Sequence, residues 1–286
     1  MFLNPYIEVV VAAVIWGSAG VFVKYLNLPA PTLTFFRLAV PAIILWAFFA
    51  YQKKPLFKGD NRLILFGSLL NVAKTFFYFL GFTLTSVGNA IIVYFTWPVF
   101  TAFLGAVVLK EKISKRNIYL FALAFAGIVF IFMNKKFSFS DYDFIGMAAM
   151  MASALATAAF MVIFKKVTVE YSKYEMIFYQ NIVGAFLFLP FLFMGSPLPN
   201  LSQLAVVIIY SILIGIVGFV FYFSALKKIK VSTASFLSYF EPISAVLFGV
   251  ILLGETISWN MAAGGSLIII SAMMLKRKRR QIDILG

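Results

Sequence analysis

Three charged side chains lie inside long apolar segments of the sequence: Arg37, Lys74 and Glu241. At the centre of a membrane helix each such charge costs about 2.5–3.5 kcal/mol on insertion scales. It therefore usually faces a cavity or an opposite charge, and is a functional candidate. Arg37 lies near the start of its segment and could instead snorkel to the membrane surface, and Glu241 could simply pair with a base. Glu241 is the only acidic residue deep in a segment, which makes it the candidate for proton coupling.

Polar and aromatic side chains accompany these charges at helical spacing. Residues three and four apart share one face of a helix. This spacing groups Asn71, Thr75 and Tyr78 with Lys74, and Ser238 with Glu241, and Tyr239 lies beside the second group. A buried Tyr or Trp favours a polar partner, so further cavity candidates are Trp16, Tyr94, Trp97 and Tyr222. Alternatively, some of these groups join helices through hydrogen bonds, worth about 0.6 kcal/mol on average.

A cavity with aromatic walls, a cation and an anion would suit a zwitterion with an apolar side chain, such as an amino acid. A cationic drug could also bind against the rings. The chain has no Cys and no His, which excludes thiol and imidazole chemistry. It also lacks paired carboxylates within the apolar segments and any metal-ligand spacing. We therefore predict no catalytic residues, no metal site, no cofactor and no enzymatic activity.

The elements that must position these residues are membrane-spanning helices. Of the 286 residues, 63% are apolar and 12% are charged, whereas soluble domains are about half apolar and about a quarter charged. A helix of about 20 apolar residues crosses a bilayer core. The sequence predicts ten such spans, at 6–24, 33–51, 63–83, 88–109, 117–134, 144–164, 175–194, 204–226, 231–253 and 258–275. The predicted fold is therefore an all-α integral membrane protein with short loops.

The basic residues that produce the net charge of +14 lie mainly in the predicted loops. Basic residues gather after every second predicted span, at Lys53, Lys54, Lys58, Arg62, Lys110, Lys112, Lys115, Arg116, Lys165, Lys166, Lys173, Lys227, Lys228, Lys230 and the run 276–280. The loops on the other side hold Lys24, Lys135 and Lys136. Because cytoplasmic loops are enriched in Lys and Arg, we predict that both termini are cytoplasmic. The positive charge then indicates topology and not nucleic-acid binding.

The chain also repeats itself at an offset of 144 residues. Matched positions include 77–79 with 221–223, Val87 with Val231, Pro98 with Pro242, Gly105 with Gly249 and Glu111 with Glu255. The two predicted halves, 1–136 and 137–286, have five spans each, so they enter the membrane from opposite sides. Such inverted repeats are a common architecture of secondary transporters. Pro98 and Pro242 each remove one helical hydrogen bond, so they are candidate hinges or gates, or else static kinks.

Several short motifs occur in a characteristic order. They are Trp16-Gly17-Ser18 with Lys24, Arg37, Pro98, Leu109-Lys110-Glu111 with Gly127, Phe240-Glu241-Pro242, and Leu253-Gly254-Glu255 with Gly264. Along essentially its whole length the chain resembles the EamA family of the drug/metabolite transporter superfamily, with one EamA-type five-helix repeat in each half. The resemblance implies a ten-helix secondary transporter of small metabolites with a central cavity between the halves. Many members export amino acids or related compounds.

We therefore expect a secondary transporter that works by alternating access and exports an amino acid or related metabolite across the cytoplasmic (inner) membrane of the cell. Its expected partners are this small molecule and the lipid bilayer, without nucleic acid, and its expected state is a monomer or a homodimer. The sequence has no glycine-rich ATP-binding loop, so we expect no direct ATP drive. The alternatives are a lipid flippase and a membrane-embedded lipid-modifying enzyme.

Overall fold

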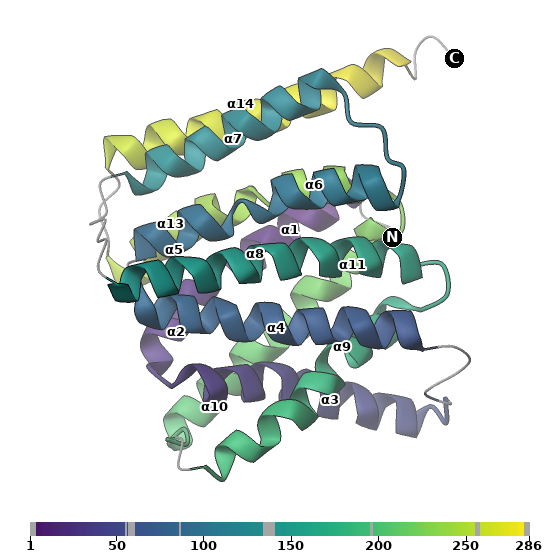
Figure 1. Cartoon of the computed structure of the whole chain (residues 1–286), viewed down its shortest axis with the longest axis vertical. Helices are drawn as coiled ribbons and strands as arrows, with labels where there is room; N and C mark the ends of the chain where they lie inside the picture. The colour runs from purple at the N-terminus through teal and green to yellow at the C-terminus, as the bar shows by residue number, and fades with distance from the viewer. Residues whose placement is uncertain are drawn as a thin grey trace.

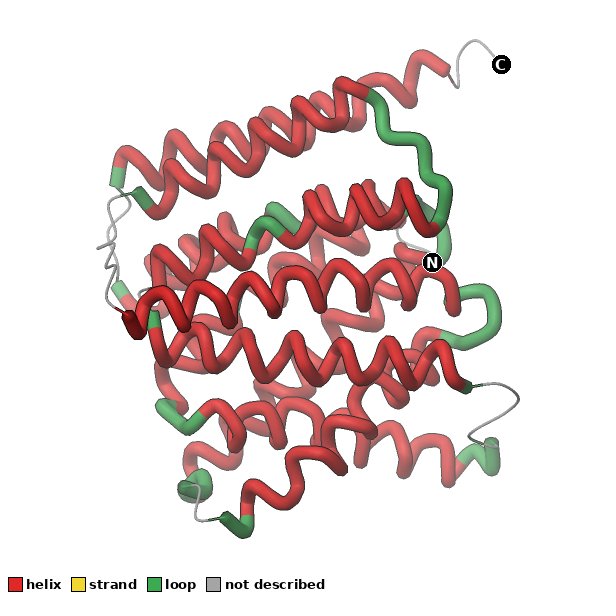
Figure 2. Tube along the Cα trace, viewed as in Figure 1, coloured by secondary structure: helices red, strands yellow, loops and turns green. Residues whose placement is uncertain are grey.

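The computed structural model describes residues 4–54, 56, 61–85, 87–133, 141–194, 197–254 and 258–282. These residues form helices and connecting loops, with no strand among them (Figures 1 and 2). The helices are α1 (Pro5–Gly17), α2 (Ala19–Leu26), α3 (Ala30–Tyr51), α4 (Arg62–Leu84), α5 (Val87–Tyr94), α6 (Trp97–Val108), α7 (Lys115–Phe132), α8 (Asp141–Val167), α9 (Lys173–Phe188), η1 (Leu189–Leu192), α10 (Leu201–Ile212), η2 (Leu213–Val217), α11 (Gly218–Leu226), α12 (Val231–Leu237), α13 (Phe240–Leu253) and α14 (Trp259–Ile282). The predicted all-α fold is confirmed for the described residues.

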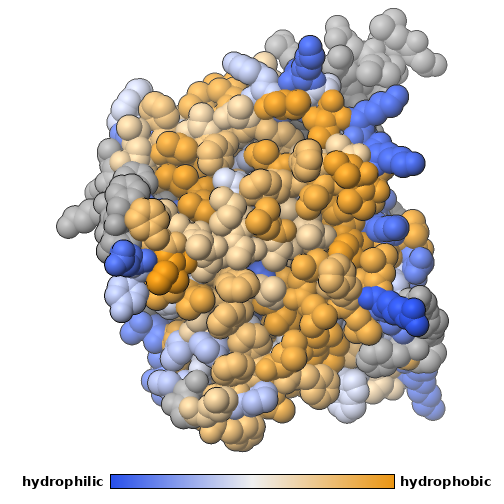
Figure 3. Space-filling view, in the orientation of Figure 1, coloured by the Kyte–Doolittle hydropathy of each residue, from blue (hydrophilic) through white to orange (hydrophobic). Residues whose placement is uncertain are grey.

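Nine helical segments within the described ranges are long and apolar enough to cross a membrane. They are Pro5–Val23, Ala30–Tyr51, Arg62–Leu84, Asn89–Val108, Lys115–Phe132, Asp141–Val167, Lys173–Leu192, Leu201–Leu226 and Val231–Leu252, and they overlap the first nine predicted spans. The tenth predicted span lies in α14, whose apolar stretch Trp259–Met274 is shorter. Apolar residues cover the middle of the molecular surface in Figure 3, and hydrophilic residues gather towards its two ends. This distribution is typical of a multi-pass membrane protein.

Side-chain caps fix where several helices begin. The side chain of Asn4 accepts a hydrogen bond from the Tyr6 backbone N–H at 3.0 Å. Proline follows it in the first turn of α1, where the missing N–H removes no helical bond. Capping boxes start α9, at Ser172 and Glu175, and α10, at Asn200 and Gln203. Each cap supplies partners to backbone N–H groups that the first helical turn leaves unpaired.

Two of the membrane-crossing segments are broken just before a proline. One break separates α5 from α6 at residues 95–96 and precedes Pro98; the other separates α12 from α13 at residues 238–239 and precedes Pro242. Because proline has no N–H, the carbonyl four residues earlier loses its helical donor. The predicted interruptions at these prolines are therefore present, while their role as hinges or gates remains a prediction.

The helices pack mainly across the two halves of the chain. α4 lies against α8, α3 lies against α9, and α1 contacts both α11 and α13. α7 and α14 pack together at one edge of the bundle (Figure 1). Gly127 of α7 and Gly264 of α14 meet there almost backbone to backbone, since a Cβ on Gly127 would lie 2.6 Å from the carbonyl oxygen of Gly264. Small residues permit this close approach between membrane helices.

Gly127→Leu is therefore expected to force α7 away from α14 and to destabilise the protein by about 1–3 kcal/mol, the usual cost of overpacking. The measurement is the thermal unfolding temperature of the purified protein. Gly265→Leu is the matched control, because a Cβ on Gly265 has open space within 4 Å. Equal unfolding temperatures for the two variants would contradict the close contact.

The two described ends of the chain lie at the same end of the bundle. Figure 1 shows the start of α1 and the end of α14 on the side that carries the loops 109–114, 168–172 and 227–230. The first and third of these loops hold Lys110, Lys112, Lys227, Lys228 and Lys230, and this side is called the basic end. Its location in the cytoplasm remains a prediction from the charge pattern. The predicted boundary at 136 and 137 lies outside the described residues, as does Glu255.

Candidate functional site

A cavity lies between the helices, close to the middle of most of the segments that line it. It encloses about 610 Å³ of space that protein atoms do not fill, including its open mouth. Its lining comes from both halves of the chain and consists of Trp16, Ala19, Arg37, Lys74, Thr75, Tyr78, Phe79, Tyr94, Trp97, Thr157, Met161, Tyr210, Ile214, Phe219 and Glu241. Mostly apolar and aromatic walls with a few polar and charged groups are typical of sites that bind small organic molecules.

Most of the predicted site residues line this cavity, and all three charges from the apolar segments are among them. The predicted residues at the cavity are Trp16, Arg37, Lys74, Tyr78, Tyr94, Trp97 and Glu241. They come from segments that are far apart in the sequence, so the tertiary structure brings them together. Their roles in binding remain predictions.

Lys74 reaches the cavity from the middle of α4, and aromatic rings surround its ammonium group. Its Nζ lies 5.1 Å from the ring centroid of Phe160 and 5.3 Å from that of Phe219. Cation–π contacts stabilise such a charge by about 0.5–2 kcal/mol. Among the described residues, no hydrogen-bond acceptor contacts this ammonium group. An anionic group on a bound solute could therefore supply the missing partner.

Arg37 shares one of these rings. Its Cζ lies 5.7 Å from the ring centroid of Phe219, and its Nη1 donates a hydrogen bond to Oδ1 of Asn181 at 3.4 Å. The hydroxyl of Tyr210 also interacts with the guanidinium group. Arg37 is 5% exposed, so its side chain lies at the cavity wall and does not snorkel to the membrane surface.

Glu241 enters the cavity from the first turn of α13, directly after the helix break. Its backbone N–H donates to the carbonyl oxygen of Ser238 at 2.9 Å. The start of a helix stabilises a negative charge by about 0.3–1 kcal/mol. In the described part of the chain, no ion pair joins Glu241 to Lys74 or Arg37. The carboxylate and the two cations therefore face the same space without neutralising one another directly.

Trp97 lines this cavity and carries a buried hydrogen-bond donor that has no partner in the described part of the chain. Its side chain is 1% exposed, and its Nε1 has no hydrogen-bond partner among the described residues. A buried donor without a partner costs about 1–3 kcal/mol. An acceptor atom on a bound solute would remove this cost.

Two predicted polar residues lie outside the cavity lining and bond to backbone carbonyl groups. Asn71 is buried, and its Nδ2 donates to the backbone oxygen of Gln180 at 2.7 Å, which joins α4 to α9. Ser238 is also buried, and its hydroxyl donates to the carbonyl oxygen of Ala234 at 3.2 Å. The Asn71 contact is of the interhelical kind that the sequence left open as an alternative, whereas Ser238 bonds within its own helix.

Two predicted tyrosines also lie outside the lining. The ring centroid of Tyr222 lies 5.1 Å from that of the cavity residue Trp16. Tyr239 packs edge-on against Phe236, with 6.0 Å between the ring centroids. Both tyrosines are almost completely buried. Tyr222 therefore supports the cavity wall through Trp16, whereas the ring partner of Tyr239 does not line the cavity.

The cavity also contains residues that the sequence reasoning missed. These are Ala19, Phe79, Thr157, Met161, Tyr210, Ile214 and Phe219. Tyr210 carries a hydroxyl within the strongly apolar run 204–226, and this contrast could have indicated that its side chain faces the protein interior. Phe219 is one of 35 Phe residues, and nothing in the sequence separates it from those that face lipid.

The comparison with known protein families is decisive for the class of protein. One family model, the EamA-like transporter family, matches the chain twice, over residues 4–133 and 144–277. The chain belongs to the EamA-like transporter family. The resemblance drawn from the short motifs is thereby confirmed, and this EamA-like protein is a multi-pass membrane transporter.

Related proteins agree with this assignment. An uncharacterized transporter of Archaeoglobus fulgidus is 25% identical to the EamA-like chain over 285 residues, which cover 97% of this chain and 100% of the relative. An S-adenosylmethionine uptake transporter of Rickettsia prowazekii is 27% identical over 212 residues, 73% of this chain and 70% of the relative. A solved crystal structure with 17% sequence identity shares the fold, with a TM-score of 0.83 over 97% of this chain and 98% of the other.

Proposed function

We propose that this protein is a secondary transporter that exports a small zwitterionic metabolite, an amino acid or a related compound, across the cytoplasmic membrane. The cavity carries this proposal, because two cations and one carboxylate face it without forming an ion pair. A solute carboxylate would bind near Lys74 and Arg37, and a solute ammonium group would bind near Glu241. The aromatic walls would contact the apolar part of the solute.

Alternating access between the two halves is supported by the pattern of helix contacts. Under the 144-residue offset, α3 against α9 and α7 against α14 are contacts between equivalent spans, and α4 against α8 has its equivalent in α1 against α11. Arg37 donates to Asn181, which is its matched residue under the same offset. Such a contact is expected at an axis that relates two repeats. Inverted repeats can expose a central site to each side of the membrane in turn.

The two proline-linked helix breaks are the proposed hinges of this motion. The break before Pro98 adjoins Trp97, and the break before Pro242 adjoins Glu241. The 144-residue offset also matches Trp97 with Glu241. Helices interrupted at corresponding positions of two repeats are typical of transporter binding regions. Motion at these breaks would therefore act directly on the proposed binding groups.

The energy source in this proposal is a proton gradient acting through Glu241, or the gradient of the solute itself. The solute named for the Rickettsia prowazekii relative, S-adenosylmethionine, contains an amino-acid group, which agrees with the proposed solute class. That relative is named for uptake, so transport into and out of vesicles should both be measured.

A thermal-shift screen of the purified protein against a metabolite library tests the proposal. An amino acid or related zwitterion is expected to raise the unfolding temperature, since a ligand at about 100 times its Kd stabilises the native state by about 2.7 kcal/mol. The positive compounds should then accumulate in sealed vesicles that contain the protein. Lipid movement or lipid turnover without movement of any soluble solute would contradict the proposal.

Trp97→Phe is expected to weaken binding of the compound identified by that screen about tenfold. The change keeps an aromatic ring but removes the N–H donor, and a hydrogen bond to a charged acceptor contributes about 1.5 kcal/mol or more. Without the compound, the variant should be about as stable as the unmodified protein, because the lost donor has no partner there. Trp46→Phe is the control, since Trp46 is 57% exposed on α3. Equal affinities for both variants would exclude Trp97 as a donor.

A further inference from the structure

The turn between α11 and α12 is held by side chains from three other parts of the chain. This segment, residues 224–232, is called the α11–α12 corner and lies at the basic end. Glu111, in the loop after α6, makes the densest set of contacts with it. Its carboxylate accepts hydrogen bonds from the backbone N–H of Val231 at 2.8 Å, the backbone N–H of Ser232 at 3.2 Å and the hydroxyl of Ser232 at 2.7 Å.

The local backbone conformation directs the Glu111 side chain towards this corner. Lys110 has a φ of 54°, a left-handed conformation that turns the chain sharply after α6. The backbone N–H of Glu111 then donates to the carbonyl oxygen of Gly105 at 3.2 Å. A Cβ on Gly105 would lie 2.7 Å from a methyl group of Val231, so glycine allows α6 and α12 to approach closely here. The Glu111 carboxylate is thus positioned at the N-terminal end of α12.

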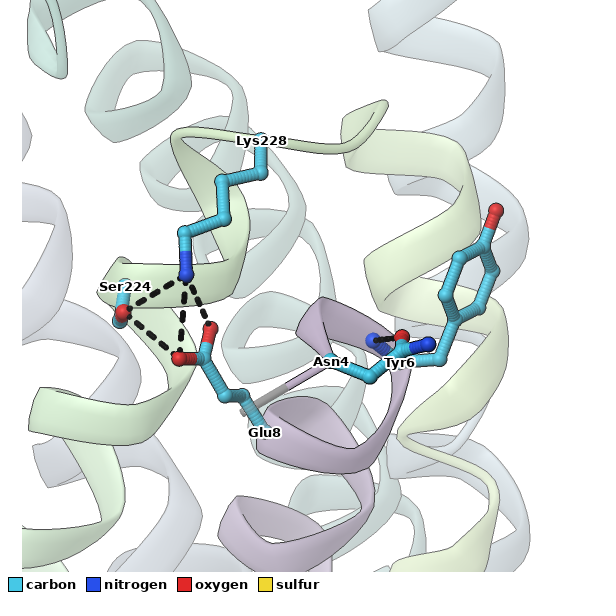
Figure 4. Close-up of polar contacts among 5 residues, drawn as sticks. All are labelled: Asn4, Tyr6, Glu8, Ser224 and Lys228. Atoms are coloured by element: carbon cyan, nitrogen blue, oxygen red, sulfur yellow. Dashed lines mark hydrogen bonds and ion pairs between the residues drawn. The ribbon is translucent and has the colours of Figure 1, made fainter. Parts of the chain in front are cut away.

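Glu8 of α1 holds the other side of the corner. Its side chain points at Lys228 and Ser224 (Figure 4). Nζ of Lys228 lies 3.1 and 3.2 Å from the two carboxylate oxygens, and the hydroxyl of Ser224 donates to one of them at 3.0 Å. Glu8 is 5% exposed, and charged hydrogen bonds at so buried a position are stronger than surface ones. This contact ties the first half of the chain to the second.

Lys165 of α8 completes the set. Its Nζ donates to the carbonyl oxygens of Leu226 and Ile229, two groups that the end of α11 leaves without helical partners. Glu8, Glu111 and Lys165 therefore converge on one short turn from three separate elements. None of the residues that line the cavity comes from this corner.

The position of the corner relative to the cavity gives these contacts a role. α12 runs from the corner to the helix break at residues 238–239, and Glu241 follows that break. The cavity lining includes Tyr78 on α4 and Tyr94, the last residue of α5, which adjoins the helix break at residues 95–96. From the helix break towards the basic end, α12 continues through the buried residues Ser235 and Ala234 to the corner. A path that ran along α12 from the cavity to the basic end would have to displace this helix and the corner.

We propose that the α11–α12 corner is the gate between the cavity and the basic end, with Glu8 and Glu111 as its latches. This inference rests on the proposed transport function and adds the elements that control access to the binding cavity. Opening requires the two carboxylates to exchange their contacts with the corner for water. Closing restores contacts that join the first half of the chain to the second.

Cysteine labelling tests the gate directly, because the chain contains no Cys. Ala234→Cys, in α12, reports access through the corner, and Ala124→Cys, completely buried in α7 and outside the cavity lining, reports any general loosening of the fold. The protein is placed in lipid nanodiscs, which leave both ends accessible to a water-soluble maleimide. Adding Glu111→Ala is expected to raise the labelling rate at position 234 at least about fivefold, the lower range of coupling effects. The rate at position 124 should stay unchanged.

Glu8→Ala should also raise the labelling rate at position 234, and Glu111→Gln should raise it less, because an amide oxygen can still accept hydrogen bonds. Glu170→Ala is the matched control, since Glu170 is an exposed carboxylate at the basic end. Unchanged labelling at position 234 in both alanine variants would overturn the gate. An increase at both positions would also overturn it, because that pattern reports a loosened fold. If the labelling agrees but no solute is transported, the transport function fails and the gate stands.

Discussion

Lys74→Ala is expected to remove solute binding while the protein still folds and inserts. The Lys74 ammonium group contacts only the rings of Phe160 and Phe219 among the described residues, so its donors are free for a solute anion. A hydrogen bond to a charged group contributes about 1.5–3 kcal/mol, which corresponds to a Kd about 10 to 150 times higher in the variant. Folding should persist, because the change removes a charge from the membrane interior, where charges are costly.

The solute-induced rise in unfolding temperature measures this effect. Lys74→Met is a second variant that keeps much of the side-chain length and removes the charge, and it should lose binding to the same extent. Lys166→Ala is the control, because Lys166 is an exposed lysine on the same face of the membrane as the basic end. Normal binding by a stable Lys74→Ala protein would make Lys74 a structural residue.

Glu241→Gln is expected to abolish solute accumulation driven by a pH gradient. Glutamine has nearly the same shape and can still accept a hydrogen bond, but it cannot take up or release a proton. Glu241 is the only acidic residue deep in an apolar segment of the sequence, and it faces the cavity. If protons drive transport, the variant should exchange solute only down its own gradient.

Proteoliposomes with an imposed pH difference provide the measurement. Uptake by the unmodified protein should rise with the size of the pH difference, and uptake by Glu241→Gln should not respond to it. Glu170→Gln makes the same chemical change on the surface and should behave like the unmodified protein. A pH response that survives in Glu241→Gln would exclude this residue as the proton carrier.

The cavity shows how far helical periodicity can predict a site. Lys74, Thr75 and Tyr78 on the continuous helix α4 all reach the cavity, as their three- and four-residue spacing predicts. Asn71, on the same predicted face, does not. Neither does Ser238, which is spaced three residues from Glu241, nor its neighbour Tyr239. The helix break falls on these two residues, so the rotation of about 100° per residue does not carry across it.

The sequence by itself determined the membrane class, the two similar halves, the family and the three charges that face the cavity. These features can be predicted from the sequence because the bilayer core is a uniform apolar solvent. The length of each apolar segment, the charge of each loop and each charge within a segment therefore strongly affect the free energy of insertion. Only the tertiary structure decided that Arg37 and Lys74 share the ring of Phe219, that Tyr222 supports the wall from behind, and that Glu8 and Glu111 meet at one turn. The reason is that a membrane helix surrounded by lipid and other helices is apolar on every side. Its rotation and its neighbours are therefore fixed by close packing and a few hydrogen bonds, which residue type and spacing alone do not specify.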